Sequence, residues 1–247
     1  WGDEAEIRSF KDRWEGGVEH YAGWMAERLR ACHRALKPDG SIYLHCDWHA
    51  SHHLRLALDT IFGPDRFQNE IIWCYNVGGK GKTRWARKHD TIFFYSKGKK
   101  WHFDGKAVGL KRETGTKSFG GKIGVDEGGR RYQDKLVKAT HKYYRYYLDE
   151  PKIPEDWWTD INSIQSQSAE RQGYPTQKPE ALLERIVKAS SAPGDTVLDP
   201  FCGCGTALAV AQRLGREWIG VDISQTAIKV IKQRVARAGA SDTKAIG

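Results

Sequence analysis

A short segment near the carboxyl end places the strongest constraint on how this chain can fold. Residues Thr196-Val-Leu-Asp-Pro-Phe-Cys-Gly-Cys-Gly-Thr206 have the pattern of a buried strand that runs into a glycine turn and opens a helix. Glycines in such a turn let the backbone approach a ligand at the carboxyl edge of a parallel sheet, where nucleotide-like cofactors bind. By itself, the Gly-x-Gly pair is equally compatible with an ordinary turn between a strand and a helix.

The spacing around this turn excludes two common nucleotide-binding motifs. A dinucleotide fingerprint needs a third glycine where Leu208 stands, and a phosphate-binding P-loop needs a lysine that the Gly205-Thr206 step lacks. Asp222 ends the next expected strand 19 residues after Gly203, where its carboxylate can accept hydrogen bonds from both ribose hydroxyls of a nucleoside. We therefore expect an adenosine-bearing ligand without a pyrophosphate.

Strands and helices alternate at both ends of the chain, which predicts an α/β fold with a parallel, doubly wound sheet and helices on both faces. Only two strands are expected after Pro193, so the other strands must come from roughly the first hundred residues. The expected elements are a helix over 20–35, a strand over 41–47, a helix over 50–62, strands over 67–75 and 90–96 that pair as an antiparallel hairpin, a helix over 179–189, a strand over 196–199, a helix over 206–214, a strand over 217–222 and a helix over 225–238.

The middle of the chain lacks this regular pattern. From residue 97 to 173, Gly, Lys, Tyr and Trp occur without steady periodicity, which indicates an irregular lobe inserted into the main domain. We expect three parts: residues 1–96 as the first half of the main domain, residues 97–173 as the lobe, and residues 174–247 as the half that binds the cofactor.

Two motifs together resemble those of a known enzyme family. Asp199-Pro-Phe-Cys-Gly-Cys-Gly-Thr206 is similar to the cofactor motif of amino-group DNA methyltransferases, and Tyr174-Pro-Thr-Gln-Lys-Pro179 resembles the motif that precedes it. The resemblance implies a Rossmann-like methyltransferase sheet that binds S-adenosylmethionine. It implies that Thr176 and Lys178 contact the methionine moiety, that Asp222 binds the ribose, that Ile223 and Ser224 border the adenine, and that the cofactor is wrapped by Asp199, Pro200, Phe201, Cys202, Gly203, Gly205 and Thr206.

The order of the motifs resembles the permuted arrangement of the beta class, in which the cofactor motifs lie behind a central lobe. Lys37–Asp47 is similar to the strand after that family's catalytic motif, Asn69–Trp73 and Arg87–Ser96 resemble its terminal hairpin, and the lobe is then the target-recognition region. The family's catalytic Asp-Pro-Pro-aromatic element does not occur between Trp1 and Gly247. We expect that element upstream of Trp1, and no catalytic residue is assigned within the chain.

The charge distribution favours an anionic partner. The chain carries a formal net charge of +9, and residues 76–150 alone contain 19 Lys+Arg against 8 Asp+Glu. Such concentration suits the phosphates of DNA, although a solvated lysine face around a small tyrosine core is the alternative. We expect phosphate contacts from Lys80, Lys82, Arg84, Arg87 and Lys88, and base stacking from Tyr132, Tyr143, Tyr144, Tyr146 and Tyr147.

The cysteines and histidines give no sign of a metal or of disulfides. The five cysteines follow no framework spacing. A metal site is the alternative interpretation of His45, Asp47, His49, His52 and His53, but His52 and His53 fall on an expected helix with no clear cysteine or carboxylate partner. The chain has no apolar run long enough for a membrane span and no signal-like leader, so we expect a cytoplasmic protein with no metal and no membrane partner.

These observations predict an enzyme that transfers a methyl group from S-adenosylmethionine to the exocyclic amine of adenine in duplex DNA, with a cognate restriction nuclease as a further candidate partner. Three alternatives remain open: methylation of the cytosine amino group, a non-catalytic DNA-binding subunit that keeps the cofactor fold, and a methyltransferase for RNA or a small molecule. Turnover on duplex DNA separates the first prediction from the last two.

Overall fold

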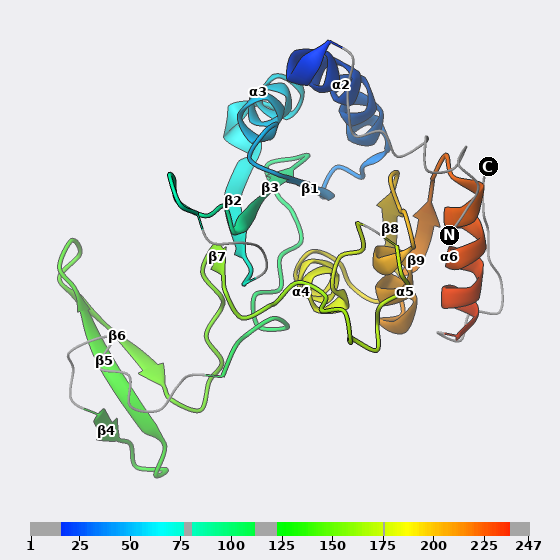
Figure 1. Ribbon diagram of the computed structural model, residues 1–247. Coiled ribbons are helices and arrows are strands. Elements are labelled where there is room, and N and C mark those ends of the chain that lie inside the picture. Colours follow the sequence, from blue (N-terminus) through cyan, green and yellow to red (C-terminus); the bar gives the residue numbers. More distant parts are fainter. Residues whose placement is uncertain (1–15, 77–80, 112–122, 175, 238–247) are drawn as a thin grey trace. The chain divides into compact units, whose positions relative to one another are not determined.

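The computed structural model describes residues 16–76, 81–111, 123–174 and 176–237 (Figure 1). The chain divides into two compact units, a main unit that runs up to Asp104 and resumes at Asp156, and a small unit that comprises Gly105–Glu155. The small unit is narrower than the lobe expected over 97–173. Backbone bonds explain the difference, because Asp104 N–H donates to the Ala189 carbonyl at 2.7 Å and Ile72 N–H donates to the Asp156 carbonyl at 2.7 Å, so both flanks belong to the main unit.

Apart from η1 and β7, which were not expected, the helices and strands of the main unit agree closely with those expected from the sequence. They are α2 (Gly17–Ala35), β1 (Ser41–Cys46), α3 (Ser51–Phe62), a short 3-10 turn η1 (Pro64–Arg66), β2 (Phe67–Cys74), β3 (His89–Ser96), β7 (Trp157–Trp158), α4 (Glu180–Ser190), β8 (Thr196–Asp199), α5 (Thr206–Arg213), β9 (Glu217–Gly220) and α6 (Gln225–Arg237).

The larger sheet of the main unit has the strand order β1-β3-β2-β7. Strand β3 pairs antiparallel with both β1 and β2, which confirms the expected pairing of β2 with β3, and β7 adds in parallel to β2. This sheet is therefore mixed rather than wholly parallel, because β3 runs against both of its neighbours, one of which is its expected hairpin partner β2.

Alternating side chains of β3 cover both faces of this sheet with apolar groups, since successive residues of a strand point to opposite sides. Phe93 and Tyr95 pack with α2 and α3, which Figure 1 shows together beside β1 and β3, whereas Ile92 and Phe94 pack in a second core with Leu182 of α4. Helices thus cover both faces, as the sequence pattern predicted.

A second, two-stranded sheet joins β8 and β9 in parallel, with Asp199 opposite Gly220. The described strands of the main unit therefore form two separate sheets rather than one. Helices α5 and α6 pack together through Leu208, Ile231 and Val235, and Cys202 from the turn joins the same core. This sheet and its two helices carry the glycine turn.

The small unit contains a three-stranded antiparallel sheet, in the order β4 (Ile123–Val125), β5 (Arg131–Val137) and β6 (Lys142–Tyr147). The expectation of an irregular lobe is therefore wrong. The strands were missed because neither face is buried, so there is no apolar alternation to detect: five of the six β6 residues are exposed. Tyrosine rings, arginines and carboxylates take the place of an apolar core.

None of the helices within the described ranges is both long enough and apolar enough to cross a membrane.

Candidate cofactor site and nucleic-acid surface

The glycine turn folds across the ends of both parallel strands of the second sheet. Val221 N–H donates to the Asp199 carbonyl at 3.0 Å, and Cys202 N–H donates back to the Val221 carbonyl at 3.1 Å. These bonds bring the carboxyl ends of β8 and β9 side by side. A ligand bound at this edge therefore meets residues from both strands.

Asp222 is held in one orientation by the turn that it faces. Its Oδ2 accepts a hydrogen bond from Gly203 N–H at 2.7 Å, and its Oδ1 accepts one from Ser224 N–H at 2.9 Å. Each carboxylate oxygen has a second lone pair. The side chain can therefore accept two further hydrogen bonds, as the two hydroxyls of a ribose require.

Asp199 lies next to Asp222 at the end of the neighbouring strand. Burial, together with the negative charge of Asp222, raises the pKa of the Asp199 carboxyl above its usual value. Its Oδ1 accepts a hydrogen bond from Phe201 N–H at 3.1 Å, which opposes that rise. Two carboxylates at one edge give the site a local negative charge that suits a cationic ligand.

The two glycines of the turn are required for different reasons. Both have positive φ, +49° at Gly203 and +75° at Gly205, which L side chains rarely adopt. A Cβ at Gly203 would lie 3.1 Å from the ring of Tyr174, and a Cβ at Gly205 would lie 2.8 Å from Cγ1 of Ile231. The sequence suggested cofactor contact at both positions, but the space beside Gly205 is filled by helix α6.

The side chain of Gln177 links residues of the segment before α4 through two hydrogen bonds. Its Oε1 accepts a hydrogen bond from Gln172 N–H at 2.7 Å, and its Nε2 donates to the Glu170 carbonyl at 2.7 Å. Thr176 is exposed, and its carbonyl accepts a bond from Lys178 Nζ at 3.3 Å. Tyr174, which was part of the motif but had no assigned role, brings this segment to the glycine turn.

The remaining predicted cofactor residues lie around the same edge. Ile223 is 92% exposed, so its apolar side chain is available to a flat ring. Phe201 is half-exposed and contacts Trp24 of α2 at 5.9 Å between ring centroids, whereas Cys202 is buried and Pro200 is partly buried. Ser224 is buried, and its hydroxyl accepts a hydrogen bond from Ala227 N–H at 3.2 Å, which caps α6.

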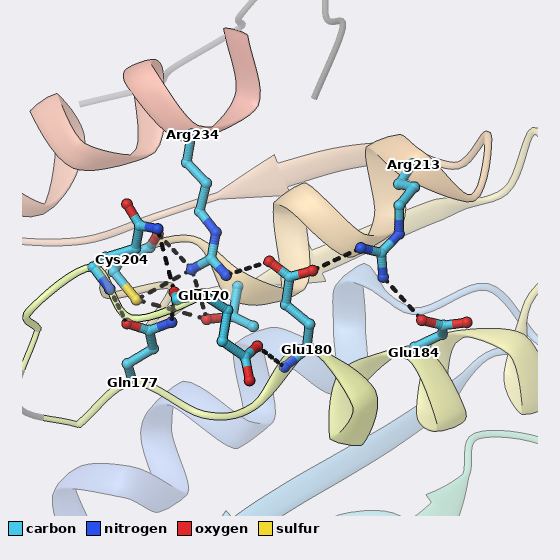
Figure 2. Close-up of polar contacts among 9 residues, drawn as sticks. Glu170, Gln177, Glu180, Glu184, Cys204, Arg213 and Arg234 are labelled. Atoms are coloured by element: carbon cyan, nitrogen blue, oxygen red, sulfur yellow. Dashed lines mark hydrogen bonds and ion pairs between the residues drawn. The ribbon is translucent and has the colours of Figure 1, made fainter. Parts of the chain in front are cut away.

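A polar network that the sequence motifs do not contain connects this turn to α4 (Figure 2). Arg234 of α6 donates to Thr206 Oγ1 at 3.0 Å and to Glu180 Oε1 at 2.7 Å, and Glu170 accepts the backbone N–H of Glu180 at 2.9 Å. Burial raises the pKa of Glu180, but its bonds to Arg234 and Arg213 outweigh burial, so the pKa lies below its usual value. No local sequence pattern indicates this network, because its partners lie up to 54 residues apart.

A second cluster lies where β1 ends and β3 begins. His45 Nε2 bonds with Asp90 Oδ2 at 2.8 Å, and Tyr75 donates to Asp90 Oδ1 at 3.0 Å. Burial lowers the pKa of His45, the bond to Asp90 opposes this, and the charge of nearby Lys178 lowers it again. Lys178 therefore lies close to the carboxyl end of β1 as well as to its own segment.

The basic loop between β2 and β3 is closed at its base. Tyr75 N–H donates to the Lys88 carbonyl at 3.0 Å. Lys82 and Arg84 are exposed, as is Trp85, whose side chain is 95% exposed. Arg87 lies over the ring of Trp48 at 3.4 Å, so its guanidinium already has a partner, and Lys80 lies outside the described residues.

The two faces of the small sheet carry different sets of charged and aromatic side chains. On one face, Arg145 stacks on Tyr132 at 3.6 Å and binds Asp134 through two bonds of 2.9 Å, while Arg130 stacks on Tyr147 at 3.8 Å. Register places another set of side chains on the opposite face, all of them at least partly exposed: Arg131, Lys135, Lys142, Tyr144 and Tyr146. Tyr143 is 71% exposed on the first face.

The histidines near residue 50 form pairs. His49 binds Asp47 at 2.7 Å, and the rings of His52 and His53 lie 4.1 Å apart. Across the described ranges, no group of three or more His, Cys, Asp or Glu side chains could hold a metal ion.

The fold of the chain is the mixed α/β fold of S-adenosylmethionine methyltransferases of known structure. Similar solved structures support the fold. The PvuII DNA methyltransferase, which is cytosine-N4-specific, has a TM-score of 0.64 at 16% identity, covering 96% of this chain and 77% of that one. The Thermus thermophilus protein TTHA0409, solved with S-adenosyl-L-methionine, has a TM-score of 0.57 at 20% identity, covering 93% and 84%.

The chain belongs to the DNA methylase family of N6 and N4 amino-group methyltransferases, whose model matches residues 6–233. The family uses S-adenosylmethionine as methyl donor. The chain is 31% identical to the DNA adenine methyltransferase YhdJ of Escherichia coli and 33% identical to the type II methyltransferase M.HpaI of Haemophilus parainfluenzae, each over 87% of this chain. It spans 67% and 59% of the lengths of these two relatives.

Proposed function

We propose that the protein containing this chain transfers the methyl group of S-adenosylmethionine to the exocyclic amine of adenine in duplex DNA. The observation that carries this proposal is the pair of aspartates at the adjacent ends of β8 and β9, joined by a glycine turn that binds Asp222. Family membership gives the reaction class. The choice of adenine rests on the likeness to YhdJ, which is named as an adenine enzyme.

The residues at this edge fit the cofactor. Asp222 is oriented to accept the ribose hydroxyls, and exposed Ile223 offers an apolar surface to the adenine. The carboxylate of Asp199 favours a positive charge, which the sulfonium group has. We assign the methionine end to Thr176 and Lys178, and to the turn from Pro200 to Thr206. When bound, S-adenosylmethionine supplies an electrophilic methyl group.

The protein's own contribution to the reaction is then positioning and exclusion of water. An exocyclic amine attacks a sulfonium methyl directly once the base has left the stack and is held in line, so no covalent nucleophile is needed. The cysteines fit this view, because burial raises the pKa of Cys46 and Cys202 to about 12 and both thiols stay protonated. None of the described cysteines is paired in a disulfide.

We propose that DNA contacts two surfaces, the basic loop of residues 81–88 and the face of the small sheet that carries Tyr144 and Tyr146. That face also carries the exposed cations Arg131 and Lys142. Cations among aromatic rings bind phosphates and stack on bases. The comparisons name no restriction nuclease, so such a partner remains a proposal from the type II names of relatives.

Methyl transfer should be measured with the gene product that carries this chain, S-adenosylmethionine with a labelled methyl group, and duplex DNA. Digestion to nucleosides and mass spectrometry should detect N6-methyladenine. N4-methylcytosine would move the target to cytosine. Salt-sensitive DNA binding without any methylated base would instead identify a non-catalytic subunit, and methylation of RNA alone would exclude the DNA proposal.

A further inference from the structure

Arg234 is a buried arginine that contacts two separate parts of the cofactor half. Only 6% of its side chain is exposed. Its Nη1 donates to Thr206 Oγ1 at 3.0 Å and lies 3.4 Å from the Cys204 carbonyl, and its Nη2 donates to Glu180 Oε1 at 2.7 Å. Figure 2 shows the guanidinium between the glycine turn and the start of α4.

The positions of these partners matter more than the number of bonds. Cys204 and Thr206 flank Gly205 at the end of the turn, and Glu180 begins α4 directly after Lys178 and Pro179. A single planar guanidinium, which holds its donors in a fixed geometry, therefore sets the spacing between the two segments assigned to the methionine end. The hydrogen bonds of Arg234 described above go to Cys204, Thr206 and Glu180, and not to Asp222 or Ile223, which are assigned to the nucleoside.

The stability of the folded chain alone does not explain the buried ion pair between Arg234 and Glu180. Removing an ion pair from water costs free energy that the attraction often only just offsets, and apolar replacements of buried pairs are often neutral. A cavity of about 340 Å³ beside Arg234 is lined by Glu170, Glu180 and Arg213 among others, and it does not reach Asp199 or Asp222. The pair is therefore better explained by the geometry that it imposes.

We propose that Arg234 is a positioning residue that sets the methionine subsite by holding the glycine turn and the Thr176–Lys178 segment at a fixed separation. This inference rests on the proposed function of the turn as the S-adenosylmethionine site. It predicts that loss of Arg234 weakens binding of the methionine end of the cofactor and leaves binding of the nucleoside end unaffected.

The structure offers a clean variant for the test. In Arg234→Met, Glu180 keeps a partner, because Arg213 Nη1 also binds Glu180 Oε2 at 2.6 Å, so no carboxylate is left unpaired. Arg213→Met is the matched control, because Arg213 is 47% exposed and binds Glu180 and Glu184 but not the turn. Arg234→Lys keeps the charge but cannot reproduce the planar geometry.

Calorimetry should compare the affinities of each variant for S-adenosylmethionine and for adenosine, with thermal unfolding measured in parallel. We expect Arg234→Met to bind S-adenosylmethionine about tenfold more weakly, a change of about 1.4 kcal/mol, and adenosine within about twofold of the unmodified chain. Arg234→Lys should show the same split to a smaller degree. Arg213→Met should bind both ligands normally.

An equal loss for both ligands, or no loss for either, would overturn the proposal. If Arg234→Met does not fold, the ratio of the two losses in Arg234→Lys decides in the same way. Failure of the proposed function has a different signature, since the unmodified chain would then bind neither ligand.

Discussion

At the residue scale, the carboxylates of Asp222 and Asp199 at the strand edge have opposite effects on the stability of the folded chain. Asp222 accepts two backbone N–H bonds from its own turn, so it contributes to the order of the site even without a ligand. Asp199 is buried beside that negative charge, and its raised pKa shows that its ionised form is disfavoured in the folded chain. The folded chain therefore retains, at Asp199, a carboxyl group whose ionised form lowers its stability.

Replacement of Asp222 by alanine should weaken S-adenosylmethionine binding by about 10- to 150-fold. The lost hydrogen bonds join hydroxyls to a charged acceptor, and such bonds contribute roughly 1.5–3 kcal/mol. Calorimetry measures the change, and thermal unfolding reports any loosening of the turn. An affinity change below twofold in a folded variant would count against the ribose role of Asp222.

Replacement of Asp199 by asparagine should raise the melting temperature at neutral pH and weaken cofactor binding. A carboxyl with a raised pKa binds its proton more tightly in the folded chain than in the unfolded chain, so its destabilising effect is complete above that raised pKa and decreases as the pH falls from it towards the ordinary pKa of an aspartate. The amide oxygen can still accept from Phe201 N–H.

Melting curves of this variant and the unmodified chain should therefore differ most at neutral pH, and the difference should decrease as the pH falls from the raised pKa of Asp199 towards the ordinary pKa of an aspartate. A variant that is less stable than the unmodified chain at neutral pH would show that the charge of Asp199 is compensated in the fold.

At the element scale, residues 81–88 of the loop between β2 and β3 form a tight turn with a closed base. A Cβ at Gly81 would lie 2.0 Å from the Arg84 carbonyl, so the chain turns tightly there, and the bonds of Tyr75 to Lys88 and Asp90 close its base. This turn keeps Lys82, Arg84 and Trp85 in solvent.

A variant with alanine at Lys82, Arg84 and Lys88 should lower the slope of log affinity against log salt by about three, because each phosphate contact contributes about 0.9 to that slope. Trp85→Ala should lower the affinity for duplex DNA without changing the slope, since stacking releases no counterions. Alanine at the exposed residues Lys229 and Lys232 of α6 is the control. An unchanged slope in the triple variant would place DNA elsewhere.

Elements with one buried face were predictable, and those without one were not. The helices and strands of the main unit show apolar periodicity, and their bounds agree with the sequence to within a few residues. Strands β5 and β6 depend on Arg–Tyr stacks and ion pairs, which leave no apolar pattern. The site was predictable where a local motif carried it, but Arg234 acts on Glu180 across 54 residues, a contact that only the folded chain creates.

At the scale of the whole molecule, the small unit should be separable from the cofactor site. Replacement of Gly105–Glu155 by a flexible Gly/Ser linker leaves the bonds of Asp104 to Ala189 and of Ile72 to Asp156 intact. We expect S-adenosylmethionine affinity within about twofold of the unmodified chain, with lower DNA affinity and a smaller salt slope. Unchanged DNA binding in gel-shift and calorimetric titrations would assign recognition to the main unit alone.

The two bonds that fix the flanks of the small unit join main-chain atoms only. Main-chain bonds do not depend on which side chains occupy the junction, so mutations there are tolerated as long as the backbone keeps its path. Recombination between related genes can therefore exchange the segment between Asp104 and Asp156 without rebuilding the strand edge that carries Asp199 and Asp222. Under the role proposed for the small unit, one such exchange would carry a new target sequence with it.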